Sequence, residues 1–503
     1  MKTYKITAVL MFFLILGSCT QNFEDINQNP NSPEDVVPSM LLTNIILSTA
    51  QPSYGKNFFN SALVSRQIVW TETIESYQYY HFDRSSFYAY GSMRNVQKMV
   101  QEAERTEEPA YLALAHFFNA WFAFDMTMVF GDVPFTDAIK GETEGAYFPK
   151  YDTQEEVFVG ILDQLEQANQ LLANTEGELQ GDIIYGGNLD SWRKVVNTFA
   201  LKVLINLSNR EGASSINIAQ KFKQIVENPS QYPIFTSNED NMQLVFSDKG
   251  GERYPFWNSS HKPYPNMDEM LVEFLKERQD KRLFYYAAPT GNAVSQGLAT
   301  NDFDAYEGAD GTAEFNDIVA QEAAKDLSRI HERYYTDFNA EPYVSLGFVE
   351  LQFNLAEAAY RGWISGDAEN YYNAGIRASM EFLRSHARSY PDVSMDDNYI
   401  TTYLQGEAVA YNAAEGLEQI ITQKFIASFL NSGWSNYYNY RRTGFPALKV
   451  NPATSLNKGN ESSIPLRWRY PQKEVDYNTE NVEEAIKRQY GDDDINGRMW
   501  LLN

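Results

Sequence analysis

Cysteine is almost absent from this chain: the only one among 503 residues is Cys19. No disulfide can form within the chain, and no cysteine nucleophile is available beyond residue 19. Packing must hold the fold instead, and 33 Tyr, 31 Phe and 8 Trp supply large side chains for it.

Positive charge is also scarce. The 41 Lys and Arg residues stand against 67 Asp and Glu residues, which gives a formal net charge of −26. Phosphate backbones and anionic lipid surfaces are bound through an excess of Lys and Arg, so we expect no nucleic-acid partner. We interpret the acidity as a source of solubility and like-charge repulsion.

Motifs of the common catalytic sites are missing. The chain has no phosphate-binding Gly-x-x-x-x-Gly-Lys loop, no Gly-x-Gly-x-x-Gly turn and no Gly-x-Ser-x-Gly elbow. The five histidines are scattered and form no His-Glu-x-x-His pair: His81, His116, His261, His331 and His386. We therefore predict a protein without cofactor that is not an enzyme. A glycan-cleaving enzyme stays an alternative, because paired catalytic carboxylates leave no linear motif.

One segment near the C-terminus has the spacing of a calcium loop. Asp492, Asp494, Asn496 and Gly497 match the opening of an EF-hand. The twelfth position, where a glutamate should close the site, is Asn503, the last residue. We therefore interpret the segment as a turn and predict no metal there.

The N-terminus carries an export signal. Lys2 and Lys5 precede an uncharged run, Ile6 to Leu16, that is too short to cross a bilayer. Small residues lead from this run to Cys19, and the junction resembles a bacterial lipobox, which implies an acylated cysteine at the start of the mature protein. An ordinary signal peptide with an incidental cysteine is the simpler alternative. The rest of the chain has no apolar run near the ~20 residues that span a membrane, so we expect attachment through lipid alone.

Three segments follow from this interpretation. We assign residues 1–18 to a lipoprotein signal peptide and residues 19–38, rich in Asn and Pro, to a lipidated tether. Residues 39–503 are expected to form a single, mostly α-helical domain.

Helical periodicity dominates this domain. An Ala-x-x-x-Phe step repeats from Ala113 to Phe124, with Gly131 and Pro134 as the stop. Thr153 and Glu156 form a capping box before the next helix. A third helix carries Trp192 to Leu207, a short one covers about Met267 to Arg278, and a hairpin joins a helix from Phe348 to one capped by Asp367. Such pairs are typical of tetratricopeptide-like repeats, although no clean period covers the chain.

Two long irregular segments, residues 232–265 and 285–313, interrupt the helices and suggest a binding site. A ligand such as a sugar needs aromatic planes beside polar groups. We assign Trp121 and Trp192 to helix cores, which leaves two aromatic clusters outside the regular helices. The candidate ligand-binding residues are Trp70, Tyr77, Tyr79, Tyr80, Trp257 and Tyr264. The alternative is that these rings only fix irregular chain to the scaffold.

Several motifs carry a family resemblance. Phe130-Gly131-Asp132-Val133-Pro134 after the first helix, and Asp182-Ile183-Ile184-Tyr185-Gly186-Gly187 before Trp192-Arg193-Lys194, resemble the SusD/RagB-type outer-membrane nutrient-binding lipoproteins. The hairpin around Glu350 and Ala356-Glu357-Ala358-Ala359 is similar to a later helix pair of that family. Arg441-Arg442-Thr443-Gly444-Phe445-Pro446 and Ile464-Pro465-Leu466-Arg467 resemble the closing motifs of its SusD-like branch. The middle third matches little.

The resemblance implies a SusD-like fold with tetratricopeptide-like helix pairs and long irregular ligand-binding loops. It also implies a surface lipoprotein that captures a nutrient, expected to be an oligosaccharide, and delivers it to a SusC-like TonB-dependent transporter. Peptide binding within the same family, or a helical scaffold that binds only protein, are the alternatives. The sequence does not name the ligand.

Overall fold

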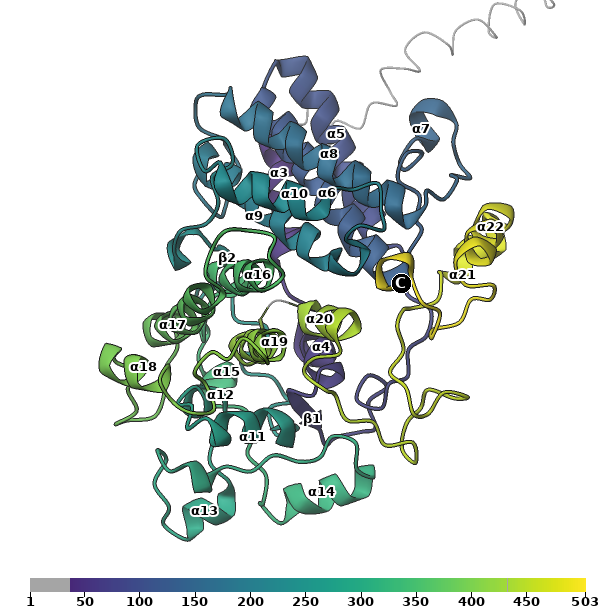
Figure 1. Cartoon of the computed structure of the whole chain (residues 1–503). Helices are drawn as coiled ribbons and strands as arrows, with labels where there is room; N and C mark the ends of the chain where they lie inside the picture. The colour runs from purple at the N-terminus through teal and green to yellow at the C-terminus, as the bar shows by residue number, and fades with distance from the viewer. Residues whose placement is uncertain (1–36, 432) are drawn as a thin grey trace, which may run out of the picture.

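Helices are the main regular elements of this computed structural model, which describes residues 37–431 and 433–503. Figure 1 shows the N-terminal helices as one group, the helices from α16 to α20 below them, and short helices and loops at the opposite end. The longer helices are α3 (Pro38–Ala50), α5 (Tyr88–Thr106), α6 (Pro109–Phe130), α8 (Gln154–Ala173), α9 (Leu189–Asn206), α10 (Ile218–Glu227), α11 (Glu269–Glu277), α14 (Phe315–Ala323), α16 (Phe348–Tyr360), α17 (Ala368–His386), α19 (Gly416–Ala427), α20 (Ser435–Thr443) and α22 (Thr479–Gln489).

Short elements fill the rest. The short helices are η1 (Gly55–Phe59), α4 (Asn60–Val64), α7 (Gly141–Glu144), η2 (Ser208–Arg210), η3 (Asn238–Asp240), α12 (Leu283–Tyr286), α13 (Gly291–Ser295), η4 (Phe303–Ala305), α15 (Arg333–Thr336), α18 (Asp397–Tyr403), α21 (Gln472–Tyr477) and η5 (Trp500–Leu502). Strands β1 (Ile68–Trp70) and β3 (Pro265–Met267) form one antiparallel pair, and β2 (Met242–Leu244) and β4 (Tyr343–Leu346) form another.

The expected helices form where their sequence signals lie. Thr153 and Glu156 make the reciprocal hydrogen bonds of a capping box at the start of α8, and Asp367 caps α17. Helix α6 ends at Gly131, whose φ of +88° favours glycine. The short middle helix runs from Glu269 to Glu277, within the range predicted for it. Periodicity and caps are local signals, which is why they predict these elements well.

The N-terminal boundary of the domain differs slightly from the prediction. Pro38, assigned to the tether, is the first residue of α3, where a fixed φ favours the first helical turn. The remainder of the predicted tether and the whole predicted signal peptide, including Cys19, lie outside the described residues.

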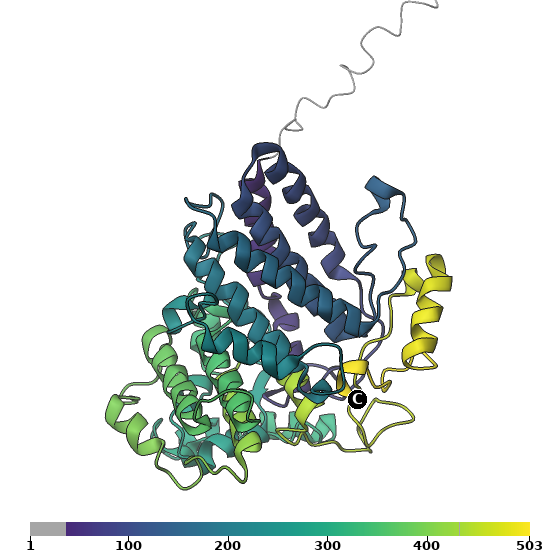
Figure 2. The same ribbon diagram turned by 45° about the horizontal axis from the view of Figure 1, so that its top comes forward.

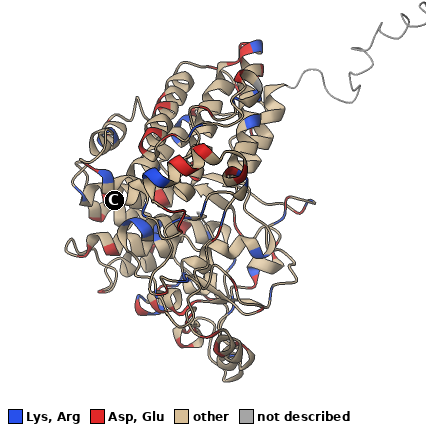
Figure 3. Cartoon of the chain, turned by 90° about the vertical axis from the view of Figure 1, so that its right-hand side faces the viewer, with Lys and Arg blue, Asp and Glu red and all other residues tan. Residues whose placement is uncertain are grey.

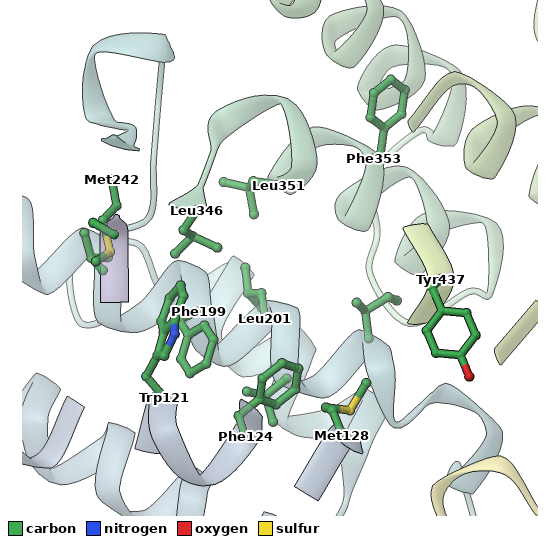
Figure 4. Close-up of a cluster of buried hydrophobic side chains, with 14 of the residues drawn as sticks. Trp121, Phe124, Met128, Phe199, Leu201, Met242, Leu346, Leu351, Phe353 and Tyr437 are labelled. Atoms are coloured by element: carbon green, nitrogen blue, oxygen red, sulfur yellow. The ribbon is translucent and has the colours of Figure 1, made fainter. Parts of the chain in front are cut away.

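Helix α6 lies at the centre of the core. Trp121 stacks on Phe199 of α9 with ring centroids 4.5 Å apart, and both predicted core tryptophans, Trp121 and Trp192, are buried. Figure 4 shows how α6 and α9 meet β2, β4, α16 and α20 through further buried side chains such as Met242 and Leu346. By length and apolarity α6 alone among the described helices could cross a membrane, but 78% of its apolar window is buried inside the protein. It is therefore placed as a core helix.

Side chains from two of the sequence motifs hold parts of the fold together through hydrogen bonds to the backbone. The carboxylate of Asp182 accepts hydrogen bonds from the backbone of Ile184, Tyr185 and Gly187 and from the indole of Trp192. It therefore shapes the turn before α9. Arg441 donates to the carbonyl oxygens of Leu466 and Met128, which ties the C-terminal segment to α6. Figure 2 shows this segment lying beside the N-terminal helices.

Candidate functional site

Two loops that are far apart in the sequence meet where β1 pairs with β3. The register places Trp70 opposite Pro265, and the backbone N–H of Thr71 donates to the carbonyl of Tyr264 at 3.2 Å. The loop after β1 and the loop before β3 are the two aromatic clusters predicted as ligand-binding. The pairing therefore brings Trp70 and Tyr264 into one place.

Three rings form an aromatic platform, which we define as Trp70, His261 and Tyr264. The ring centroid of Trp70 lies 5.9 Å from that of His261 and 6.0 Å from that of Tyr264. Trp70 is fully buried, whereas His261 and Tyr264 are half-buried and present the outer surface. The ring of Trp70 is covered by surrounding side chains in this structure, and its predicted ligand contact stays a prediction. The ring supports the other two rings from below.

Polar and charged side chains lie beside the platform and elsewhere in the loop that carries His261 and Tyr264. Nδ1 of His261 lies 3.2 Å from a carboxylate oxygen of Glu72. In the same loop the guanidinium of Arg253 lies 4.3 Å from the centroid of the half-buried Trp257 ring. Arg253 is itself paired with Asp248 at 2.8 Å. This is the combination of apolar planes and hydrogen-bonding groups that a polar ligand with a flat face requires.

The other predicted residues lie elsewhere. Tyr79 and Tyr80 are buried: the hydroxyl of Tyr79 donates to the carbonyl of Ala313, and that of Tyr80 accepts from Arg66 and donates to Lys449. Burial raises the pKa of Tyr80 to about 12 despite the opposing effect of Arg66. Both hydroxyl groups are bonded to remote segments of the chain, and the predicted ligand contact of the two rings stays a prediction.

Tyr77 belongs to a separate aromatic cluster near the C-terminal segment. Its ring lies 5.4 Å from Trp434 and 5.5 Å from Phe82, and its hydroxyl accepts a hydrogen bond from the indole of Trp468. Tyr77 is half-buried. The structure does not join it to the platform, so a ligand contact of Tyr77 stays a prediction of its own.

A polar groove was not foreseen from the sequence. It encloses about 320 Å³ and is lined by Asn266, Ala288, Pro289, Gly291, Glu322, Lys325, Leu327, Arg329 and Tyr335. Asn266 is fully buried, and its Nδ2 donates to Thr71 and to the carbonyl of Tyr264. Its Oδ1 has no hydrogen-bond partner among the described residues. A buried acceptor of this kind is costly unless something donates to it.

The platform and the groove are neighbours, because the loop before β3 and the strand β3 contribute residues to both. Asn266 is bonded to the backbone of Tyr264, and the carbonyl of Tyr335 accepts from the backbone of Asn258, next to Trp257. Arg329 is ion-paired with Glu322 across the groove. The sequence signal that could have found part of this site is His261, which stands between Trp257 and Tyr264 in the aromatic loop.

The groove offers little for hydrolysis. A paired-carboxylate mechanism needs two carboxyl groups on either side of the scissile bond. Among the groove-lining residues of the described chain Glu322 is the one carboxylate, and Arg329 holds it in an ion pair. The geometry favours binding.

The segment with EF-hand spacing forms a turn. Oδ1 of Asp494 accepts hydrogen bonds from the backbone and side chain of Asn496, and the Asn496 side chain also pairs with Asn457. Within residues 37–431 and 433–503, no group of three or more His, Cys, Asp or Glu side chains is arranged to hold a metal ion.

Comparison with known proteins gives consistent matches. A SusD-like family model described as "Starch-binding associating with outer membrane" matches residues 30–471. A SusD homologue from Bacteroides fragilis is 39% identical, with a TM-score of 0.88 over 93% of this chain and 100% of that one. A protein from Bacteroides vulgatus, described as a putative outer-membrane protein probably involved in nutrient binding, is 37% identical with a TM-score of 0.85 and the same coverage.

A more distant likeness shows the fold alone. A structure described as a chitin-binding protein is 24% identical, with a TM-score of 0.75 over 92% of this chain and 99% of that one. No curated protein sequence matches.

Proposed function

The chain belongs to the SusD-like family of starch-binding, outer-membrane-associated proteins, and from this premise we propose that it is a cell-surface lipoprotein that captures an oligosaccharide and delivers it to a SusC-like TonB-dependent transporter. In this proposal residues 1–18 are the signal peptide, residues 19–37 form the lipidated tether, and the binding domain begins with α3 at Pro38. The protein is a binder, not an enzyme.

One observation carries the ligand class: the half-buried rings of His261 and Tyr264 adjoin a groove lined by polar and charged side chains such as Glu322, Lys325 and Arg329. A sugar ring fits both features, because it has an apolar face for Tyr264 and hydroxyl groups that can hydrogen-bond with the polar side chains of the groove. Peptides also carry donors and apolar groups, so the ligand test must include them.

Removal of the Tyr264 ring should weaken ligand binding. We expect Tyr264→Ala to reduce the affinity for the best-binding oligosaccharide by about tenfold or more, because the stacking surface disappears. A glycan and peptide array on the protein finds that oligosaccharide, and isothermal titration calorimetry measures the loss. Trp257→Ala tests the second exposed ring in the same way.

Tyr477 supplies the matched control, since this tyrosine on α21 is 74% exposed and lies in a distant part of the chain. Tyr477→Ala should leave the affinity unchanged. Equal affinities of wild type and Tyr264→Ala would contradict the platform as the binding site, and an unchanged affinity of Trp257→Ala would exclude a ligand contact of that neighbouring ring. Binding of peptides alone would replace the oligosaccharide in the proposal.

Delivery to a transporter predicts a stable partner. Affinity purification of the tagged protein from detergent-solubilised outer membranes should recover a large β-barrel protein in a reproducible ratio. Antiparallel helix pairs such as α5–α6 and α16–α17 give the broad, regular surface that a protein partner needs. Repeated purification without any barrel protein would count against this part of the proposal, and would leave the ligand site untouched.

A further inference from the structure

A second cavity lies at the junction of five elements, and its lining shares no residue with the platform or the groove. It has a volume of about 60 Å³, room for on the order of four water molecules. We call it the junction cavity; its lining comes from β4, α16, α17, α19 and α20 and the adjoining loops, and Figure 1 shows α16, α19 and α20 as neighbours. Val344, Val349, Ala427 and Ser428 on its rim are half-buried, so small molecules can reach it.

The buried charges beside this cavity are unbalanced. Nζ of Lys202 lies 3.0 Å from Glu350 and 3.1 Å from the hydroxyl of Ser435. Nζ of Lys424 lies 3.7 Å from the other oxygen of Glu350 and donates to Asn354 at 2.8 Å. All three charged side chains are at least nine-tenths buried. Two ammonium groups thus share one carboxylate.

Other charged groups reduce the imbalance only in part. Asp125 also interacts with Lys202, but burial raises its pKa to about 7, so it is not fully ionised at neutral pH. Arg442 and Glu357 act on Lys424 with opposite signs. Burial lowers the pKa of Lys424 to about 8 even though Glu350 opposes this. The site therefore holds an ammonium group, on the cavity-lining residue Lys424, whose positive charge the neighbouring carboxylates offset only in part.

The side chains that line the junction cavity indicate which kind of ligand it can hold. Val344, Val349 and Ala427 contribute apolar surface, and Phe382 closes one side. Gly347 allows the close approach of Val344, because a Cβ at position 347 would lie 2.8 Å from the Val344 side chain. Ser428 and Asn436 also line the cavity, and the hydroxyl of Ser428 donates to the side-chain oxygen of Asn436. The surroundings suit one anionic group attached to a short apolar chain.

We propose that the junction cavity binds a short aliphatic monocarboxylate of about two to four carbons, with its carboxylate on Lys424 and its chain against Val344, Val349 and Ala427. Such a ligand neutralises the surplus ammonium and joins α16, α19 and α20. The site is independent of the oligosaccharide site.

The test uses the full chain in detergent, with sodium butyrate as the probe and sodium chloride at equal ionic strength as the reference. We expect saturable binding of butyrate in calorimetry and a rise in melting temperature that chloride does not produce. Butyramide has the same shape without the charge and should bind roughly tenfold to a hundredfold more weakly.

Two variants test the two features of the site separately, the free space of the cavity and the ammonium group. Ala427→Leu fills the cavity and leaves every charged group in place, and it should abolish butyrate binding. Lys424→Met removes the ammonium and should do the same. Ala173→Leu, at an exposed position on α8, is the matched control and should bind like wild type.

Three results would overturn the proposal: butyrate acts no differently from chloride, Ala427→Leu binds butyrate as wild type does, or butyramide binds as tightly as butyrate. If Lys424→Met does not fold, Ala427→Leu still decides the matter. Oligosaccharide affinity should stay unchanged in Ala427→Leu, which separates this site from the proposed nutrient site.

Discussion

Replacement of Glu357 by glutamine is expected to destabilise the fold by about 3–5 kcal/mol, the usual result when one partner of a buried ion pair is removed. Glu357 on α16 is 1% exposed and accepts hydrogen bonds from both nitrogens of the Arg442 guanidinium on α20 and from Arg361. Glutamine keeps the shape but leaves the buried Arg442 without its carboxylate. Urea unfolding followed by circular dichroism measures the loss.

The free energy of unfolding should also depend differently on pH in wild type and in Glu357→Gln under acidic conditions. Burial alone would raise the pKa of Glu357, but Arg442 and Arg361 outweigh it and hold the pKa at about 2 against an ordinary value of 4.5. The stability from this group is therefore complete above pH 4.5 and is lost as the pH falls towards 2. The stability difference between wild type and Glu357→Gln should shrink across this window.

Glu381→Gln on α17 is the control. Its carboxylate is 38% exposed and lies 3.9 Å from Arg377, so its replacement should cost at most about 1 kcal/mol. If Glu357→Gln proved as stable as Glu381→Gln, the ion pair between α16 and α20 would not contribute as described.

The helical scaffold was predictable because its signals are local. The capping box at Thr153 and the cap at Asp367 each depend on residues within one turn. The buried ion pair between Glu357 and Arg442 was not predictable in the same way. These residues are 85 positions apart, and a charged residue on an amphipathic helix is ordinarily expected at the surface. Figure 3 shows positions of Lys and Arg interspersed with positions of Asp and Glu along the ribbon.

The binding site was predictable in composition and not in geometry. Aromatic density drew attention to both loops but did not predict that they meet, because three-residue strands carry no periodic signal and the contact between Thr71 and Tyr264 spans 193 positions. The burial of Tyr79 and Tyr80 was not predictable either, since their hydroxyl partners Ala313 and Lys449 come from remote segments. The position of Asn266 beside the groove was not predictable, because a single asparagine in a strand belongs to no recognisable sequence motif.

Replacement of Cys19 by alanine should remove the protein from the cell surface. The side chain is the only thiol in the chain, so no other residue can take the acyl groups. Among the described helices, α6 alone is long and apolar enough to span a bilayer, and its burial keeps it in the core. Membrane fractionation and radiolabelled fatty acid should show complete loss of acylation and release of the protein from the outer membrane.

Thr20→Ala is the neighbouring control and should remain acylated and surface-bound. The purified Cys19→Ala protein should bind its oligosaccharide with unchanged affinity, because the described domain begins at residue 37 and the platform is built from residues 70 to 264. Retention of Cys19→Ala at the surface would contradict the lipid anchor. A loss of affinity in solution would mean that the N-terminal segment takes part in ligand binding, since the platform itself does not contain Cys19.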